Sequence, residues 1–287
     1  MGQLITVKEA AEKFQEHLKK RKNAIATILA YSRDIGQMES FLKKKGVSVI
    51  NAVTEPLLEE LKTDFEKKGY SPKSVSRKIN ALKSFFRFLK EENLLEYNPA
   101  ATLAHPKATN KPLRILTRLE YRALRDACRG NIRISAIVEL MLQTGMKIGE
   151  ISNLTLKDIK NDEIDIRPFE SRPGRIVPLN KSAKEALQRY LAERPKCKTN
   201  FLFVTRTGKP LLVRNIRATV EKYLQEVGIK NVKLTDLRHT WAYYRLLAGT
   251  PITTVAKIAG HKRLTTTEKY LRLIEEKKEK PIKLEEL

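Results

Sequence analysis

Cysteine, tryptophan and histidine are scarce in this sequence of 287 residues, which holds two, one and four of them respectively. The two cysteines, Cys128 and Cys197, are too few for a disulfide framework or a cysteine-ligated metal site. We therefore expect reduced thiols, no bound metal and a cytoplasmic location. No apolar run reaches the roughly 18 residues that a membrane-spanning helix needs. The first residues have the character of a helix cap, not of a signal peptide, so we expect no membrane partner.

Acidic residues are also in short supply, because 33 Asp and Glu face 57 Lys and Arg and leave a formal charge of +24. A positive excess of this size attracts polyanions, among which nucleic acid is the obvious candidate. The alternative is a protein with solvated lysine-rich faces, such as thermophiles use. Charge alone leaves both interpretations open.

Apolar residues at helical spacing predict four amphipathic helices in the first third of the chain. Capping signals support them: Thr6 with Glu9 at the first, and Ser71 with Pro72 at the fourth. The polar face of the fourth helix carries Lys73, Arg77, Asn80, Ser84 and Arg87. Such a face can lie along a DNA groove with its cations on phosphates. A merely solvated helix face is the alternative.

Proline and lysine then interrupt the helical pattern. Pro106 and Pro112 deny helix to the residues before them, and Lys107 and Lys111 add positive charge that we expect to contact DNA. We predict a basic linker over residues 106–116. It joins a helical DNA-binding domain (1–105) to a second domain (117–273), which a charged tail (274–287) follows.

The second domain is predicted to be mainly α-helical with a small antiparallel β-sheet. Isoleucine and valine alternate over 164–166 and 176–179, with a turn around Pro173 and Gly174 between them. Helical spacing predicts helices at about 131–143, 180–193 and 216–227.

The stretch from 235 to 273 predicts three short helices. The second has Thr250 and Pro251 as its start signals and Gly260 as a left-handed cap. Thr265 and Glu268 fit a capping box for the third. Arg238, His261 and Tyr270 are then polar residues at or near helix ends around one packed unit.

The blocks LRHTWA, AGHKRLTTTEKY and QTGMKIGEISNLTLKDI resemble the tyrosine recombinase (phage integrase, Xer-like) family, in which a tyrosine stands nine residues after a histidine, as here. The resemblance implies a two-domain DNA clamp with a helical, SAM-like core-binding domain and a catalytic domain. It implies site-specific breakage and rejoining of double-stranded DNA through a 3′-phosphotyrosine intermediate, without a cofactor. It also implies self-association, as a dimer or tetramer, on DNA.

The resemblance places Tyr270 as the nucleophile, with Arg238 and His261 beside the phosphate. Other positions depart from the family pattern. Lys147 stands where the family has its first arginine, and Thr235 where it has His or Lys. Counting back from RIVPL puts Glu170 at the position of the family's lysine, with the cation Arg172 two residues later.

The candidate catalytic set is therefore Tyr270, Arg238, His261, Lys147 and Arg172. Two functions fit it: a recombinase with an atypical site, or a DNA-binding architectural or regulatory protein on the same scaffold that no longer cuts. A basic RNA-binding helical protein is a third interpretation, which the resemblance disfavours. His239 and Trp241 are assigned to packing.

Overall fold

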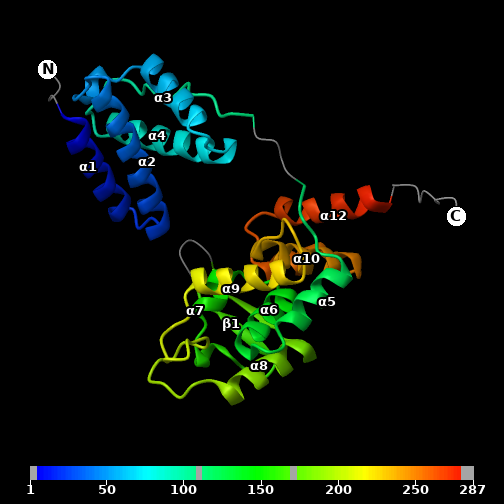
Figure 1. The fold of residues 1–287 in the computed structure, drawn as a ribbon. Coiled ribbons are helices and arrows are strands. Elements are labelled where there is room, and N and C mark those ends of the chain that lie inside the picture. The colour runs from blue at the N-terminus through cyan, green and yellow to red at the C-terminus, as the bar shows by residue number, and fades with distance from the viewer. Residues whose placement is uncertain (1–4, 108–111, 169–172, 279–287) are drawn as a thin grey trace. The chain divides into compact units, whose positions relative to one another are not determined.

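The chain forms two compact units in the computed structural model, Met1–Lys111 and Pro112–Leu287 (Figure 1). The structure describes residues 5–107, 112–168 and 173–278. Each unit has a hydrophobic core built from its own residues. None of the helices within these described ranges is long and apolar enough to cross a membrane.

The N-terminal unit consists of the four helices that the apolar spacing predicts. They are α1 (Val7–Lys20), α2 (Ile25–Lys44), α3 (Glu55–Lys67) and α4 (Pro72–Glu91), with a short 3-10 helix, η1 (Ile50–Ala52), before α3. The predicted capping box is present: Thr6 Oγ1 accepts from the Glu9 N–H at 3.2 Å, and Glu9 Oε2 accepts from the Thr6 N–H at 2.9 Å. Ser71 caps α4 through its side chain. Phe14, Phe65, Phe85 and Phe86 fill the core between the helices.

The C-terminal unit is mainly helical with a small sheet, as predicted. Its elements are α5 (Arg118–Ala127), α6 (Ile132–Thr144), α7 (Ile148–Asn153), η2 (Leu156–Asp158), β1 (Glu163–Ile166), β2 (Arg175–Pro178), α8 (Lys181–Glu193), α9 (Val213–Glu226), α10 (Leu234–Leu247), α11 (Ile252–Ala259) and α12 (Thr265–Lys278). The strands pair antiparallel, with Ile164 opposite Val177. Because α6 is buried along most of its length and packs on both α8 and α10, it forms the centre of this unit.

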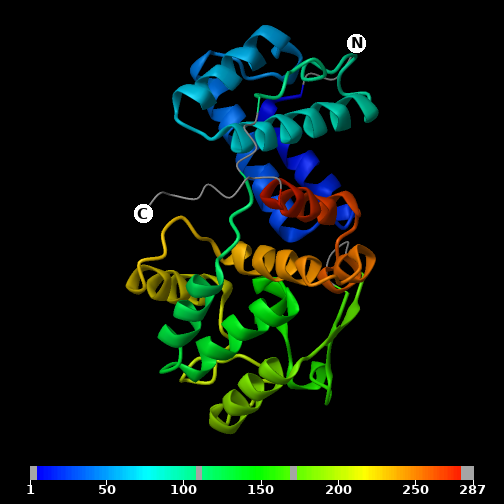
Figure 2. The same cartoon turned by 90° about the vertical axis from the view of Figure 1, so that its right-hand side faces the viewer.

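A second core cluster in this unit joins α10, α11 and α12, and α12 packs along α10 (Figure 2). Trp241 and Tyr270 are both buried in it. The segment before α5 is fastened to the same helix, because the Leu116 N–H donates to Thr240 Oγ1 at 2.9 Å and Tyr244 Oη donates to the Leu116 carbonyl at 3.3 Å. Helix α10, which carries Arg238, is thus held by α11, by α12 and by the segment before α5.

Two of the predicted helix starts are wrong. Helix α11 begins at Ile252 with Pro251 as its N-cap residue, so Thr250 does not cap it. At α12 the Glu268 N–H donates to the Leu264 carbonyl, which is the ordinary helical bond, so Thr265 is already inside the helix. Gly260, in contrast, ends α11 in the left-handed conformation as predicted. Helix α12 also continues past residue 273, where the sequence was expected to become a tail.

Candidate active site

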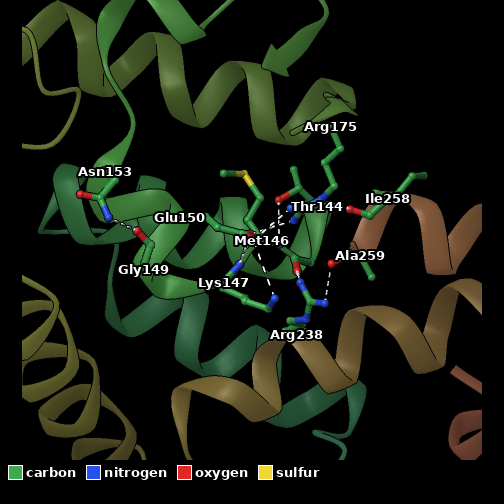
Figure 3. Close-up of polar contacts among 11 residues, drawn as sticks. Thr144, Met146, Lys147, Gly149, Glu150, Asn153, Arg175, Arg238, Ile258 and Ala259 are labelled. Carbon is green, nitrogen blue, oxygen red and sulfur yellow. Dashed lines mark hydrogen bonds and ion pairs between the residues drawn. The ribbon is translucent and has the colours of Figure 1, made fainter. Parts of the chain in front are cut away.

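Arg238 lies buried on α10 between the ends of two other helices (Figure 3). Its Nη1 donates to the carbonyl of Gly145, the left-handed residue that ends α6, and its Nη2 donates to the carbonyl of Ala259, the last residue of α11, both at 2.6 Å. Carbonyl groups at helix C-termini have no partners within the helix and carry partial negative charge. The site therefore holds a buried guanidinium in one fixed orientation.

Lys147 and Thr235 line the same cavity as Arg238, which has a volume of about 320 Å³. Lys147 is the N-cap residue of α7, and its Nζ lies 3.9 Å from Glu150 Oε1. Thr235 is exposed in the first turn of α10. Lys147 and Thr235, which differ from the pattern of the family that the sequence resembles, thus lie at one cavity with Arg238, which fits that pattern.

A half-buried ion pair between Glu150 and Arg175, which the sequence did not predict, lines the same cavity. Both side chains are labelled in Figure 3. Arg175 on β2 donates to Glu150 through Nη1 at 3.0 Å and Nη2 at 2.8 Å, and through Nε to the Ile258 carbonyl at 2.7 Å. Burial tends to raise the pKa of Glu150, but the hydrogen bonds from Arg175 and from the Lys147 N–H, with the charges of both residues, hold that pKa below its ordinary value. The pair ties β2 to α7 and to the end of α11.

Gly260 is required beside this ion pair. A Cβ atom at residue 260 would lie 3.0 Å from the Arg175 guanidinium carbon, and the backbone is left-handed there, with φ of 64°. A side chain would push against Arg175 and strain the turn. The turn that presents His261 is thereby fixed against β2.

His261 is a neutral imidazole at pH 7. Its Nδ1 is 2.8 Å from Thr267 Oγ1, at the start of α12. Burial, followed by the positive charges of Arg238 and Lys147, lowers the pKa of His261 to about 4. A neutral imidazole can donate one hydrogen bond and accept another.

Tyr270 lies between two histidines. Its ring stacks beside that of His261, with centroids 6.4 Å apart and an interplanar angle of 13°, while its Oη is 2.7 Å from His239 Nδ1. Burial raises the pKa of Tyr270, and the positive charge of Arg238 offsets part of that rise. His239, assigned to packing from the sequence, also places its ring nitrogen on the hydroxyl of the candidate nucleophile.

The structure thus gathers Arg238, His261, Tyr270 and Lys147 in one region of the C-terminal unit. Arg172 and the neighbouring Glu170 lie outside the described residues. Chemically, the arrangement offers two cations at a cavity, a neutral imidazole and a tyrosine hydroxyl, which are groups able to bind an anion and attack it.

The predicted DNA-binding stripe lies along the solvent side of α4. Of its members Lys73, Arg77, Asn80 and Arg87 are exposed and Ser84 is half-buried. Arg77 pairs with the buried Asp34, whose other oxygen accepts from Lys78 Nζ at 2.9 Å. Lys107 is exposed, and Lys111 lies outside the described residues.

Comparisons with known proteins find a matching family model for each of the two units. Residues 114–277 match the phage integrase family, and residues 11–93 match the phage integrase N-terminal SAM-like domain. The tyrosine recombinase XerC of Oceanobacillus iheyensis is 33% identical over 273 residues, which cover 90% of this chain and 89% of that protein.

Solved structures show the same fold. The Tn1549 transposon integrase in complex with a circular intermediate DNA superposes with a TM-score of 0.79 at 21% identity, over 95% of this chain and 99% of that one. A lambda integrase from a tetramer bound to a Holliday junction gives a TM-score of 0.77 at 16% identity, over 91% of this chain and 79% of that one.

Proposed function

The chain belongs to the phage integrase family of tyrosine recombinases, and on that premise we propose that it is a site-specific recombinase that breaks and rejoins duplex DNA through a 3′-phosphotyrosine intermediate. The observation that carries the proposal is geometric: Tyr270 Oη lies 2.7 Å from His239 Nδ1 on α10, and the preceding residue of that helix, Arg238, has its guanidinium held by the carbonyls of Gly145 and Ala259. A nucleophile beside a fixed cation is what phosphoryl transfer requires.

In the proposed reaction the scissile phosphate occupies the cavity lined by Arg238 and Lys147. Their positive charges stabilise the negative charge that builds on the non-bridging oxygens. Tyr270 Oη attacks phosphorus in line, the bond to the 5′ oxygen breaks, and that oxygen leaves with a proton. The phosphotyrosine link conserves the bond energy, so the reverse attack by a 5′ hydroxyl rejoins the strand.

The remaining candidate residues take supporting roles. His261, neutral at pH 7, donates a hydrogen bond to the phosphate, and Arg172 is proposed as a further cation for that phosphate. Lysine delivers its charge from one point, whereas arginine forms a two-pronged contact with phosphate, so Lys147 makes the site atypical for the family.

DNA binding is proposed to involve both units. The exposed cations of α4 and Lys107, together with Lys111, contact the duplex on one side, and the C-terminal unit contacts it on the other, as a clamp. Lambda integrase is described as a tetramer on a Holliday junction. We therefore propose that this chain also self-associates on DNA, as a dimer or tetramer.

A nicked suicide duplex tests the reaction. The site is first selected from a pool of random-sequence duplexes by binding, and a nick beside the scissile phosphate then traps the covalent adduct on a denaturing gel. Wild type should give an adduct. Tyr270→Phe should give none while binding the same duplex equally, because only the hydroxyl oxygen is removed.

The alternative function is DNA binding without cleavage. One observation favours it: Thr235, at the position where the family has a basic residue, is exposed at the cavity and cannot be a cation. If neither wild type nor a Lys147→Arg, Thr235→His, Glu170→Lys variant forms an adduct on a tightly bound site, the binding-only function stands instead.

A further inference from the structure

The proposed reaction requires a residue that takes the proton from the Tyr270 hydroxyl, and none has been assigned so far. A tyrosine hydroxyl has an ordinary pKa near 10, and burial raises the pKa of Tyr270 further. At neutral pH the hydroxyl attacks only if a neighbouring group takes its proton as the bond to phosphorus forms. The group must lie within hydrogen-bond distance of Oη.

His239 meets this geometric requirement. Its Nδ1 lies 2.7 Å from Tyr270 Oη. His261 is directed elsewhere, because its Nδ1 lies 2.8 Å from Thr267 Oγ1 and its ring stacks against that of Tyr270. The two histidines that border the tyrosine therefore have different partners, and the ring nitrogen on the hydroxyl belongs to His239.

The helix that carries His239 also holds it in register with the phosphate site. His239 follows Arg238 directly on α10, and Arg238 is fixed by the carbonyls of Gly145 and Ala259. Thr240, the next residue, is tied to the Leu116 N–H and to the Asp236 carbonyl. The imidazole is half-buried and anchored on both sides in sequence, so it is a preorganised partner for the hydroxyl.

We propose that His239 is the general base that accepts the Tyr270 proton during strand cleavage, an inference that rests on the proposed recombinase function. In this step the Oη–H bond breaks and the proton moves to Nδ1, while the Oη–phosphorus bond forms and the bond from phosphorus to the 5′ oxygen breaks. The 5′ oxygen takes a proton from another donor. In rejoining, the imidazolium returns its proton to the departing tyrosine oxygen.

The groups around His239 favour the neutral ring, whose Nδ1 can accept a proton. Burial lowers its pKa below 6.5, Asp236 on the same helix opposes that shift, and Arg238 reinforces it. The titratable neighbours from the packed elements are His261 at the end of α11 and Tyr270 on α12. The downward direction of this shift favours the neutral imidazole, which is the form that can accept a proton. For Nδ1 to accept, the ring must carry its proton on Nε2.

The test compares wild type with His239→Asn in single-turnover adduct formation on the nicked duplex described above. Asparagine keeps a polar atom near the position of Nδ1 but cannot take up a proton. We expect the variant to be slower by about 10²- to 10⁴-fold. Its rate should rise about tenfold per pH unit above pH 7, as hydroxide replaces the base, whereas the wild-type rate should be level there. His17→Asn, a histidine on α1 in the N-terminal unit, is the matched control.

A second substrate separates loss of a base from loss of an acid. A duplex with sulfur as the 5′ bridging atom has a leaving group that departs without a proton. The His239→Asn defect should be as large on this duplex as on the oxygen duplex, because Tyr270 must still lose its proton. Recovery of the rate on the sulfur duplex would assign His239 to protonating the leaving group and overturn the proposal.

The remaining outcomes are also decisive. A variant that binds DNA and cleaves at the wild-type rate overturns the proposal while the recombinase function stands. Faster cleavage overturns it too, and shows that the hydrogen bond restrains the tyrosine. A slow variant with the pH profile of wild type would assign His239 a structural role only. Absence of an adduct from wild type itself would instead count against the recombinase function.

Discussion

At the scale of single residues, Lys147 is predicted to stand where the family pattern has its first arginine. Its charge is placed at the cavity beside Arg238, but one ammonium cannot reproduce a two-pronged phosphate contact. We expect Lys147→Arg to raise the rate of adduct formation by roughly ten- to a hundredfold, since one additional charged hydrogen bond contributes about 1.5–3 kcal/mol. Lys147→Gln, which loses the charge, should lower it. A lower rate in Lys147→Arg would show that Lys147 protonates the 5′ oxygen.

The titration of His261 predicts how stability depends on pH. Its folded pKa of about 4 lies below the ordinary value of 6.5, so between these values the unfolded chain binds a proton that the folded chain does not. Stability should therefore fall as pH drops from 7 to 5, by about 1 to 2 kcal/mol once partial exposure is allowed for. His239 shifts in the same direction.

Denaturant midpoints at pH 7 and pH 5 measure this effect. Glu150 contributes only at lower pH, because its pKa is held below the ordinary 4.5. His261→Asn should flatten the dependence. An unchanged pH dependence in that variant would contradict a half-buried, neutral imidazole at residue 261.

At the scale of elements, the end of α6 is the most constrained point near the site. Gly145 has φ of 65°, and a Cβ there would lie 2.2 Å from Trp241 Cε3. Gly145→Ala should lower the free energy of unfolding by at least about 2 kcal/mol, from backbone strain and overpacking. Gly149→Ala is the control, since no atom lies within 4 Å of its Cβ and its φ is not left-handed. Chemical denaturation should separate the two variants, and equal midpoints would contradict the constraint.

Elements were predictable from the sequence where local chemistry decides them. The spacing of apolar residues located α1 to α4 and the strand pair, and Gly260 located the end of α11. The ion pair of Glu150 with Arg175 was not predictable, because its partners are 25 residues apart and meet only when β2 packs beside α7. The same holds for Arg238 and Gly145, which are 93 residues apart. The predicted N-cap at Thr250 was wrong because the neighbouring residue, Pro251, occupies the N-cap position of α11.

At the scale of the whole molecule, the two units should fold independently. The core clusters of the C-terminal unit draw all their residues from Ile115 onward, and that of the N-terminal unit ends at Leu103. A fragment of residues 112–287 should therefore unfold cooperatively on its own, within about 1 kcal/mol of its stability in the full chain, because no core cavity is created. Calorimetry of the fragment and the full chain makes the comparison. A fragment without a cooperative transition would contradict independent cores.

Charge at the same scale predicts how the protein binds DNA. With a formal charge of +24, binding should release counterions from the duplex. The logarithm of affinity should fall against the logarithm of salt concentration with a slope of roughly −5 or steeper, near −0.9 for each phosphate contacted. Titrations of the full chain on a selected duplex measure the slope. Lys73→Ala should make this slope shallower by about 0.9, the value for one phosphate contact. An affinity that does not change with salt concentration would contradict DNA binding.

The two hydrogen bonds between the Leu116 backbone and α10 connect the chain that precedes α5 directly to that helix. The chain that arrives from the N-terminal unit is bonded through the Leu116 N–H to Thr240, one residue from His239 and two from Arg238. A pull on residues 112–116 is therefore delivered to the helix that carries Arg238, and to α5 through the ion pair of Arg114 with Glu120. If both units bind the same duplex, as proposed, tension in the connecting chain would act directly on α10.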